Sequence, residues 1–190
     1  MDPLHIVAFS GSLRRQSLNR TLIDIAGSRA AAIDGVEVDV IDLRDHPLPL
    51  YDADLQERDG IPDEARRVFD RIAASDALMI ANPEYNGGYP AVFKNLVDWV
   101  SRIDMFVFHP RYVGLLSATP GKGGGLRGIE HTRALFDNIF VTSHAEPFGL
   151  PSAGDVLEDG ALVDPAESQR LDDWVDGFVA AARANAGSGG

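Results

Sequence analysis

Residues 6–20 read IVAFSGSLRRQSLNR, and this stretch decides both the fold class and the first candidate site. The apolar run at 6–9 has the composition of a buried strand. Beyond Ser17 the pattern changes to helical spacing, with apolar residues at positions 22, 26, 30 and 33. The residues between these two patterns are therefore predicted to form a strand-to-helix turn, with Ser17 or Asn19 as the N-cap.

Three arginines lie at the predicted start of this helix: Arg14, Arg15 and Arg20. A helix N-terminus carries about half a unit of positive charge, so cations are normally unfavourable there. The conflict disappears if an anion binds at this point, because free backbone N–H groups, hydroxyls and a guanidinium can all hold a phosphate. The turn therefore predicts a phosphate site. The alternative is a surface turn in which a Ser or Asn only caps the helix.

Apolar runs and amphipathic stretches alternate along the rest of the chain. Five strands alternating with helices predict an α/β protein with three α/β/α layers around a doubly wound parallel sheet. We expect one domain over residues 1–185 and a flexible tail at 186–190. The further strands are expected at 36–41, 77–81, 113–117 and from Ile139, and the helices from Pro62, near Pro90, near Leu126 and after Pro165.

Composition excludes several classes of function. The chain has 190 residues, a formal net charge of −12 and no cysteine. Such acidity is unfavourable for binding nucleic acid or an anionic membrane surface, and the absence of cysteine excludes disulfides and thiolate chemistry. The five histidines show no close metal-ligand pairing, so no metal site is expected. Without a signal-length or membrane-length apolar run, we expect a cytoplasmic protein.

A second candidate loop, Asn82-Pro83-Glu84-Tyr85-Asn86-Gly87-Gly88-Tyr89-Pro90, follows the predicted third strand. Its prolines restrict the backbone, and its glycines allow a ligand to approach closely. Exposed backbone groups can bond the edge of a planar heterocycle, with Tyr85 or Tyr89 against its face. The alternative is an ordered surface loop in which Pro90 opens the next helix.

These two loops, followed by Lys94-Asn95-Leu96-Val97-Asp98-Trp99, closely resemble the NADPH-dependent FMN reductase family, which includes chromate and quinone reductases and some azoreductases. The resemblance covers most of residues 4–183. It implies a flavodoxin-like five-stranded fold, tight non-covalent binding of FMN, and assembly as a homodimer or homotetramer. The sequence departs from the family's pattern at Gly87-Gly88-Tyr89, Ala91 and Phe93. These residues border the substrate face, so the family's substrate preference does not transfer to this chain.

The resemblance also implies the cofactor site, residue by residue. Ser12, Arg14, Ser17, Leu18 and Asn19 would hold the phosphate; Pro83, Glu84, Tyr85 and Asn86 would line the isoalloxazine; Ser117, Thr119 and Gly121 would close the other side of the ring.

The glycine-rich stretch from Gly123 to Gly128 formally fits the G-x-G-x-x-G dinucleotide pattern. A true fingerprint usually follows the first strand, whereas this one follows the fourth. We therefore interpret it as a flexible loop, in which Lys122 or Arg127 meets the phosphates of a nicotinamide cofactor. Tyr89 is expected on the same substrate side. A fixed NAD site is the alternative.

The function expected from these features is that of an FMN-dependent NAD(P)H oxidoreductase. A hydride would pass from NADPH or NADH to FMN, and two electrons would then pass to a small-molecule acceptor: a quinone, azo or nitro compound, chromate or flavin. Because the flavin supplies the chemistry, no protein acid, base or nucleophile is required. Two alternatives stay open: an FMN electron carrier that does not oxidise NAD(P)H, and a dehydrogenase with NAD at the glycine-rich loop.

Overall fold

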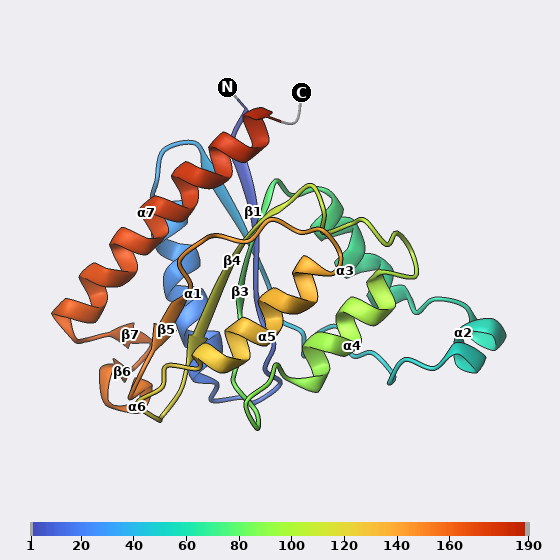
Figure 1. The fold of residues 1–190 in the computed structure, drawn as a ribbon, viewed down its shortest axis with the longest axis horizontal. Helices are drawn as coiled ribbons and strands as arrows, with labels where there is room; N and C mark the ends of the chain where they lie inside the picture. Colours follow the sequence, from blue (N-terminus) through green and yellow to red (C-terminus); the bar gives the residue numbers. More distant parts are fainter. Residues whose placement is uncertain (1, 189–190) are drawn as a thin grey trace.

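The computed structural model describes residues 2–188, and its main sheet has five parallel strands in the order β2-β1-β3-β4-β5 (Figure 1). This is the flavodoxin-like order, in which the winding reverses between β1 and β3 and ligands bind at the carboxyl ends of the strands. The predicted fold class is therefore confirmed. The strands are β1 (Leu4–Ser10), β2 (Val36–Ile41), β3 (Ala77–Ala81), β4 (Tyr112–Ala118) and β5 (Phe148–Leu150).

The register brings the carboxyl ends of the strands to one edge of the sheet, at the bottom of Figure 1. β1 pairs with β3 so that Ser10 lies beside Ala81. β3 in turn pairs with β4, and Ala81 lies beside Leu116. The loops that follow these three strands are consequently neighbours, although they are far apart in the sequence.

Helices cover both faces of the sheet. α1 (Leu18–Ala31) and α7 (Pro165–Ser188) pack on one face, and α3 (Asp63–Ala73), α4 (Ala91–Val100) and α5 (Leu126–Asp137) pack on the other. The helices within residues 2–188 are too short or too polar to span a bilayer.

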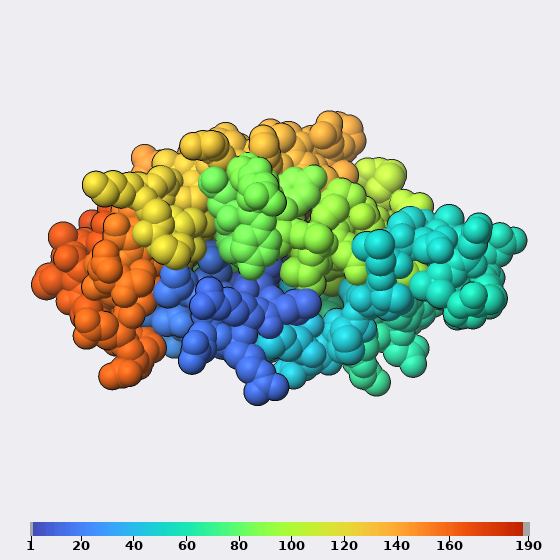
Figure 2. Space-filling view, turned by 90° about the horizontal axis from the view of Figure 1, so that it is seen from below, coloured from blue at the N-terminus to red at the C-terminus, as the bar shows by residue number. Residues whose placement is uncertain are grey.

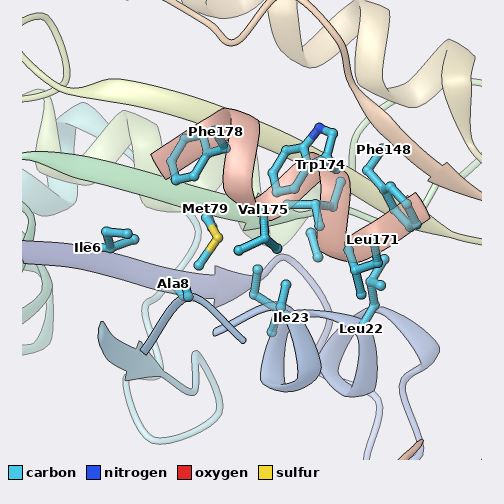
Figure 3. Close-up of a cluster of buried hydrophobic side chains, with 14 of the residues drawn as sticks. Ile6, Ala8, Leu22, Ile23, Met79, Phe148, Leu171, Trp174, Val175 and Phe178 are labelled. Atoms are coloured by element: carbon cyan, nitrogen blue, oxygen red, sulfur yellow. The ribbon is translucent and has the colours of Figure 1, made fainter. Parts of the chain in front are cut away.

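The side chains of β1 alternate between two apolar cores, as the period of a strand requires. Ile6 and Ala8 belong to the core beneath α1 and α7, whereas Val7 and Phe9 belong to the core beneath α3, α4 and α5. Figure 3 shows the first of these cores, where α1 and α7 meet side chains of the sheet around Met79. Burial on both faces explains the continuous apolar character of β1 and β3.

The fifth strand was expected from Ile139 and is found later, so that expectation was wrong. Residues 138–140 form a turn after α5, with Phe140 at φ 60° and 69% exposed. A phenylalanine at positive φ cannot continue a strand. Val141 is nevertheless buried, so the apolar run serves core packing, and pairing with β4 begins only after it, at an isolated bridge between Ser143 and Val113.

Short elements occupy loops in which no structure was expected. α2 (Ala53–Asp59) projects from the body of the protein and buries none of its residues (Figures 1 and 2). α6 (Ala153–Val156), β6 (Leu157–Glu158) and β7 (Ala161–Leu162) follow β5. α7 continues to Ser188, so the first part of the expected tail at 186–190 is helical, and residues 189–190 lie outside the described residues.

Candidate functional site

A cleft of about 140 Å³ lies at the carboxyl edge of the sheet, where the loops after β1, β3 and β4 meet. Figure 2 views this edge, with the three loops in blue, green and yellow. Larger grooves exist elsewhere, including one near Asp2 and Arg183, but that groove borders the amino end of β1, away from the edge where ligands bind such sheets. The cleft is lined by Ser12, Arg14, Ser17, Leu18, Asn19, Pro83, Glu84, Tyr85, Ala118, Thr119 and Pro120.

The start of α1 presents a set of hydrogen-bond donors to this cleft. Ser17 is the N-cap of α1, as predicted, and its Oγ accepts the backbone N–H of Arg20 at 3.2 Å. The hydroxyl of Ser12 accepts the backbone N–H of Arg14 in the same way, at 3.3 Å. Within residues 2–188, both hydroxyl protons stay free to donate, and so do the backbone N–H groups of Leu18 and Asn19. This donor set suits a phosphate.

The three arginines of the turn differ in their surroundings. The guanidinium of Arg20 pairs with Asp24 at 2.8 Å and with Asp42 at 3.0 Å, so its presence near the helix start needs no bound anion. Within residues 2–188, the guanidinium groups of Arg14 and Arg15 have no hydrogen-bond or ion-pair partner, and only that of Arg14 lines the cleft. Of these three arginines, Arg14 is therefore the one whose position favours a bound anion in the cleft.

The side chain of Asn19 is already engaged. Its Nδ2 donates to the carbonyl of Ala118 at 2.8 Å, and its Oδ1 accepts the N–H of Ala118 at 2.9 Å. Only 3% of the residue is exposed. The amide is thus committed to the end of β4, and the backbone N–H is the part of Asn19 that can face a phosphate.

The loop after β3 closes into a tight turn. Tyr85 and Gly88 exchange two backbone hydrogen bonds, at 2.9 and 3.0 Å. Asn86 and Gly87 between them have φ values of 52° and 79°, as a type I′ turn requires. Asn86, at the tip, does not line the cleft, whereas Tyr85 does and is 52% exposed. Tyr89 instead packs edge-on against an aromatic side chain of α4 and is partly buried.

Of the residues expected at the end of β4, Thr119 lines the cleft, whereas Ser117 and Gly121 do not. Ser117 is fully buried, and a Cβ at Gly125 would lie 2.0 Å from its Oγ, so its side chain cannot reach a ligand in the cleft. Gly121 does not line the cleft either. Ala118 and Pro120 line the cleft beside Thr119, and neither carries a polar side chain; only their position after a strand marks them.

The glycine-rich loop leads into α5, whose N-terminus is occupied by a carboxylate. Oε2 of Glu84 accepts the backbone N–H of Gly128 at 3.2 Å. A dinucleotide pyrophosphate would need this position, and a second anion there is unfavourable. The geometry therefore disfavours a fixed NAD site. Lys122 and Arg127 are exposed and, within the described part of the chain, make no ion pair.

Together, the sheet order and the donor-rich cleft define a flavodoxin-like protein of the FMN-binding class. Residues 4–153 match the model of the NADPH-dependent FMN reductase family, and the chain belongs to that family. It is an oxidoreductase with FMN as cofactor and NAD(P)H as the source of electrons, as the resemblance implied.

Similar proteins agree with this assignment. The chain is 33% identical over 183 residues to a probable NADPH:quinone oxidoreductase 2 of Oryza sativa subsp. japonica, covering 90% of this chain and 85% of that protein. It is 31% identical over 175 residues to a quinone reductase of Escherichia coli (strain K12), covering 85% and 89%. The solved structure of FerB, a flavoenzyme NAD(P)H:(acceptor) oxidoreductase from Paracoccus denitrificans, superposes with a TM-score of 0.82 at 25% identity, covering 96% of this chain and 98% of FerB.

Proposed function

We propose that FMN binds in the cleft at the carboxyl edge of the sheet, and that the enzyme passes electrons from NADPH through FMN to a quinone. The observation that carries this proposal is the donor set at the start of α1. Within residues 2–188, two hydroxyl protons, the guanidinium of Arg14 and the backbone N–H groups of Leu18 and Asn19 are without a partner and lie there, in a chain whose net charge is −12. An acidic protein that gathers donors at one point has the chemistry to hold a phosphate.

In this proposal the phosphate contacts come from Ser12, Arg14, Ser17 and the backbone N–H groups of Leu18 and Asn19. Arg14 contributes a charge-assisted bond, which is stronger than a neutral one. The hydroxyls donate the protons that their existing bonds leave free. The residues present therefore fit the phosphate end of FMN.

The ring end of FMN lies between the loops after β3 and β4. Pro83, Glu84 and Tyr85 line one side, and residues 118–120 line the other. Bound FMN supplies the hydride and electron transfer itself. The chain's part is to orient the ring, and backbone N–H groups near it can stabilise negative charge.

The nicotinamide cofactor approaches from the glycine-rich loop. Within residues 2–188, the cationic side chains of Lys122 and Arg127 make no ion pair, so they can pair with the 2′-phosphate that distinguishes NADPH from NADH. Tyr89 is proposed on the same substrate side, and its ring is partly buried against α4. We propose a preference for NADPH on this basis.

The proposal includes assembly as a homodimer or homotetramer and a cytoplasmic location. Support for assembly comes from large apolar side chains left in solvent at Leu50, Met105 and Phe106, which are 79%, 53% and 51% exposed. Exposed apolar surface of this kind marks contact sites between proteins. The projecting α2 follows directly after Leu50.

The test is a steady-state assay of purified, FMN-loaded protein with NADPH and a soluble benzoquinone. Rapid NADPH oxidation that depends on both FMN and quinone supports the proposal. FMN that is held tightly but is not reduced by NADPH or NADH contradicts it and indicates the electron carrier instead. Azo, nitro, chromate and flavin acceptors tested in parallel show whether quinone is the preferred acceptor.

A further inference from the structure

We propose that Asn19 is a positioning residue that fixes the two walls of the cleft relative to one another through Ala118, and that its side chain is not a ligand of the phosphate. This inference rests on the proposed FMN site and assigns one of its residues a different role. Asn19 and Ala118 are separated by 99 residues in the sequence and meet only because of the fold.

The amide groups of Asn19 that face Ala118 are already hydrogen-bonded, so they cannot also bind a phosphate. One N–H of the amide donates to the Ala118 carbonyl at 2.8 Å, and the amide oxygen accepts the Ala118 N–H at 2.9 Å. The two bonds satisfy both backbone groups of Ala118, in the pattern that a neighbouring strand would provide. Their burial makes them costly to break, because Ala118 would be left with unpaired polar groups.

The two residues belong to opposite walls of the cleft. Asn19 lies in the first turn of α1, two residues after the N-cap Ser17 and among the phosphate donors. Ala118 is the last residue of β4, and Thr119 and Pro120 continue from it along the ring side of the cleft. The distance between phosphate donors and ring contacts is therefore set where Asn19 meets Ala118.

The remaining contacts of this wall lead away from α1. The N–H of Thr119 donates to the carbonyl of Leu150 at 3.1 Å, and its carbonyl accepts the N–H of Ala153 at 2.8 Å. Both partners lie in or after β5. Within residues 2–188, the hydrogen bonds between α1 and β4 are those of Asn19 alone. Without them, the loop after β4 stays attached to β5 but loses its hydrogen bonds to the phosphate wall.

Riboflavin separates this role from a direct phosphate contact, because it carries the ring and ribityl chain of FMN without the phosphate. A lost phosphate ligand weakens FMN binding and leaves riboflavin binding unchanged. A lost positioning residue weakens both, because the spacing of the walls matters to both. The loss of a residue needed only for stability changes neither dissociation constant, as long as the protein is folded.

The experiment measures the dissociation constants of FMN and riboflavin by flavin fluorescence, for wild-type protein freed of flavin and for Asn19→Ala, well below the melting temperature of each. We expect both constants to rise by a similar factor of about ten, equivalent to about 1.4 kcal/mol. Arg14→Ala is the reference for a lost phosphate ligand and should weaken the binding of FMN but not that of riboflavin. Arg29→Ala removes a different attachment of α1, to Ser168 and Asp172 of α7, and should lower stability without changing either constant.

Each other result overturns the inference. If Asn19→Ala weakens the binding of FMN but not that of riboflavin, the side chain is a phosphate ligand. If neither dissociation constant changes, its role is structural only. Asn19→Ser, which is too short to bond both groups of Ala118, replaces Asn19→Ala if that variant does not fold. If wild-type protein binds neither flavin, the proposed function fails, and this result is distinct from those that concern Asn19.

Discussion

The carboxylate of Glu84 is hydrogen-bonded to the backbone N–H of Gly128, with Oε2 and N 3.2 Å apart. The bond joins the loop after β3 to the first turn of α5. A Cβ at Gly128 would lie 3.1 Å from the Cβ of Glu84, so the two segments are in close contact. The loop proposed to line the flavin is thus attached to the helix that follows the glycine-rich loop.

Replacing Glu84 with Ala should therefore destabilise the protein. The N-terminus of α5 loses an acceptor and a favourable negative charge, which together contribute about 1 kcal/mol. Glu84→Gln keeps the acceptor and should lose less. Urea unfolding of the two variants measures the difference, and equal stability of Glu84→Ala and wild type would show that the bond contributes nothing.

Arg14→Ala should reduce FMN retention by about one to two orders of magnitude, because a charge-assisted bond to the phosphate is lost. Arg15→Ala is the matched control, since Arg15 is adjacent and equally unpaired but does not line the cleft. Flavin content after desalting compares the two. Wild-type flavin content in Arg14→Ala would argue against the phosphate assignment.

Gly11→Ala should impair folding or flavin binding, because a Cβ at this position would lie 2.0 Å from the Oδ1 of buried Asn82. Movement of Asn82 would disturb the start of the loop after β3. Gly121→Ala is the control, as its Cβ would meet nothing within 4 Å. Melting temperature and flavin affinity should fall in the first variant and stay near wild type in the second.

Much of the fold was predictable, because hydrophobic period and capping act locally. Ser17 caps α1 as its sequence indicates, and the unbroken apolar run of β3 reveals a central strand. The position of β5 was not predictable in the same way. Its three residues include Gly149, while the apolar run at Ile139 is used for packing after α5. Only the tertiary structure decides between these two uses of apolar residues.

The candidate site shows the same limit. The resemblance implied that Ser12, Arg14 and Ser17 hold the phosphate, and all three line the cleft. They could not show that Asn19 bonds Ala118, which lies 99 residues away, or that Arg20 pairs with Asp42. Such long-range partners are set by which elements the fold brings together, and a local pattern does not contain that information.

Asp42 should make the stability of the protein sensitive to acid. A hydrogen bond from Arg44, helped by the charge of Arg20, lowers the pKa of Asp42 to about 2, against about 3.9 in an unfolded chain. The folded state therefore favours the ionised form, and this stabilisation is present above about pH 4 and is lost as the pH falls towards about 2.

Asp42→Asn should accordingly lower stability at pH 7 by about 1–2 kcal/mol and flatten its dependence on pH below about 4. Urea unfolding across this pH range measures both effects. A variant as steeply acid-sensitive as wild type would assign the sensitivity to other carboxylates.

The double variant Lys122→Ala/Arg127→Ala should raise the KM for NADPH by about tenfold and change that for NADH little, because only NADPH carries the 2′-phosphate. Arg66→Ala removes an exposed cation on α3 and is the control. Equal increases for NADPH and NADH would show that the two cations do not read the 2′-phosphate.

The central claim is that the cleft holds FMN and that NADPH reduces it there. The most direct measurement is the absorbance spectrum of purified protein after addition of FMN and desalting, followed by anaerobic addition of NADPH. We predict that flavin bands remain after desalting and bleach in a single two-electron step when NADPH is added. Loss of the flavin on desalting, or retained flavin that neither NADPH nor NADH bleaches, would contradict this account.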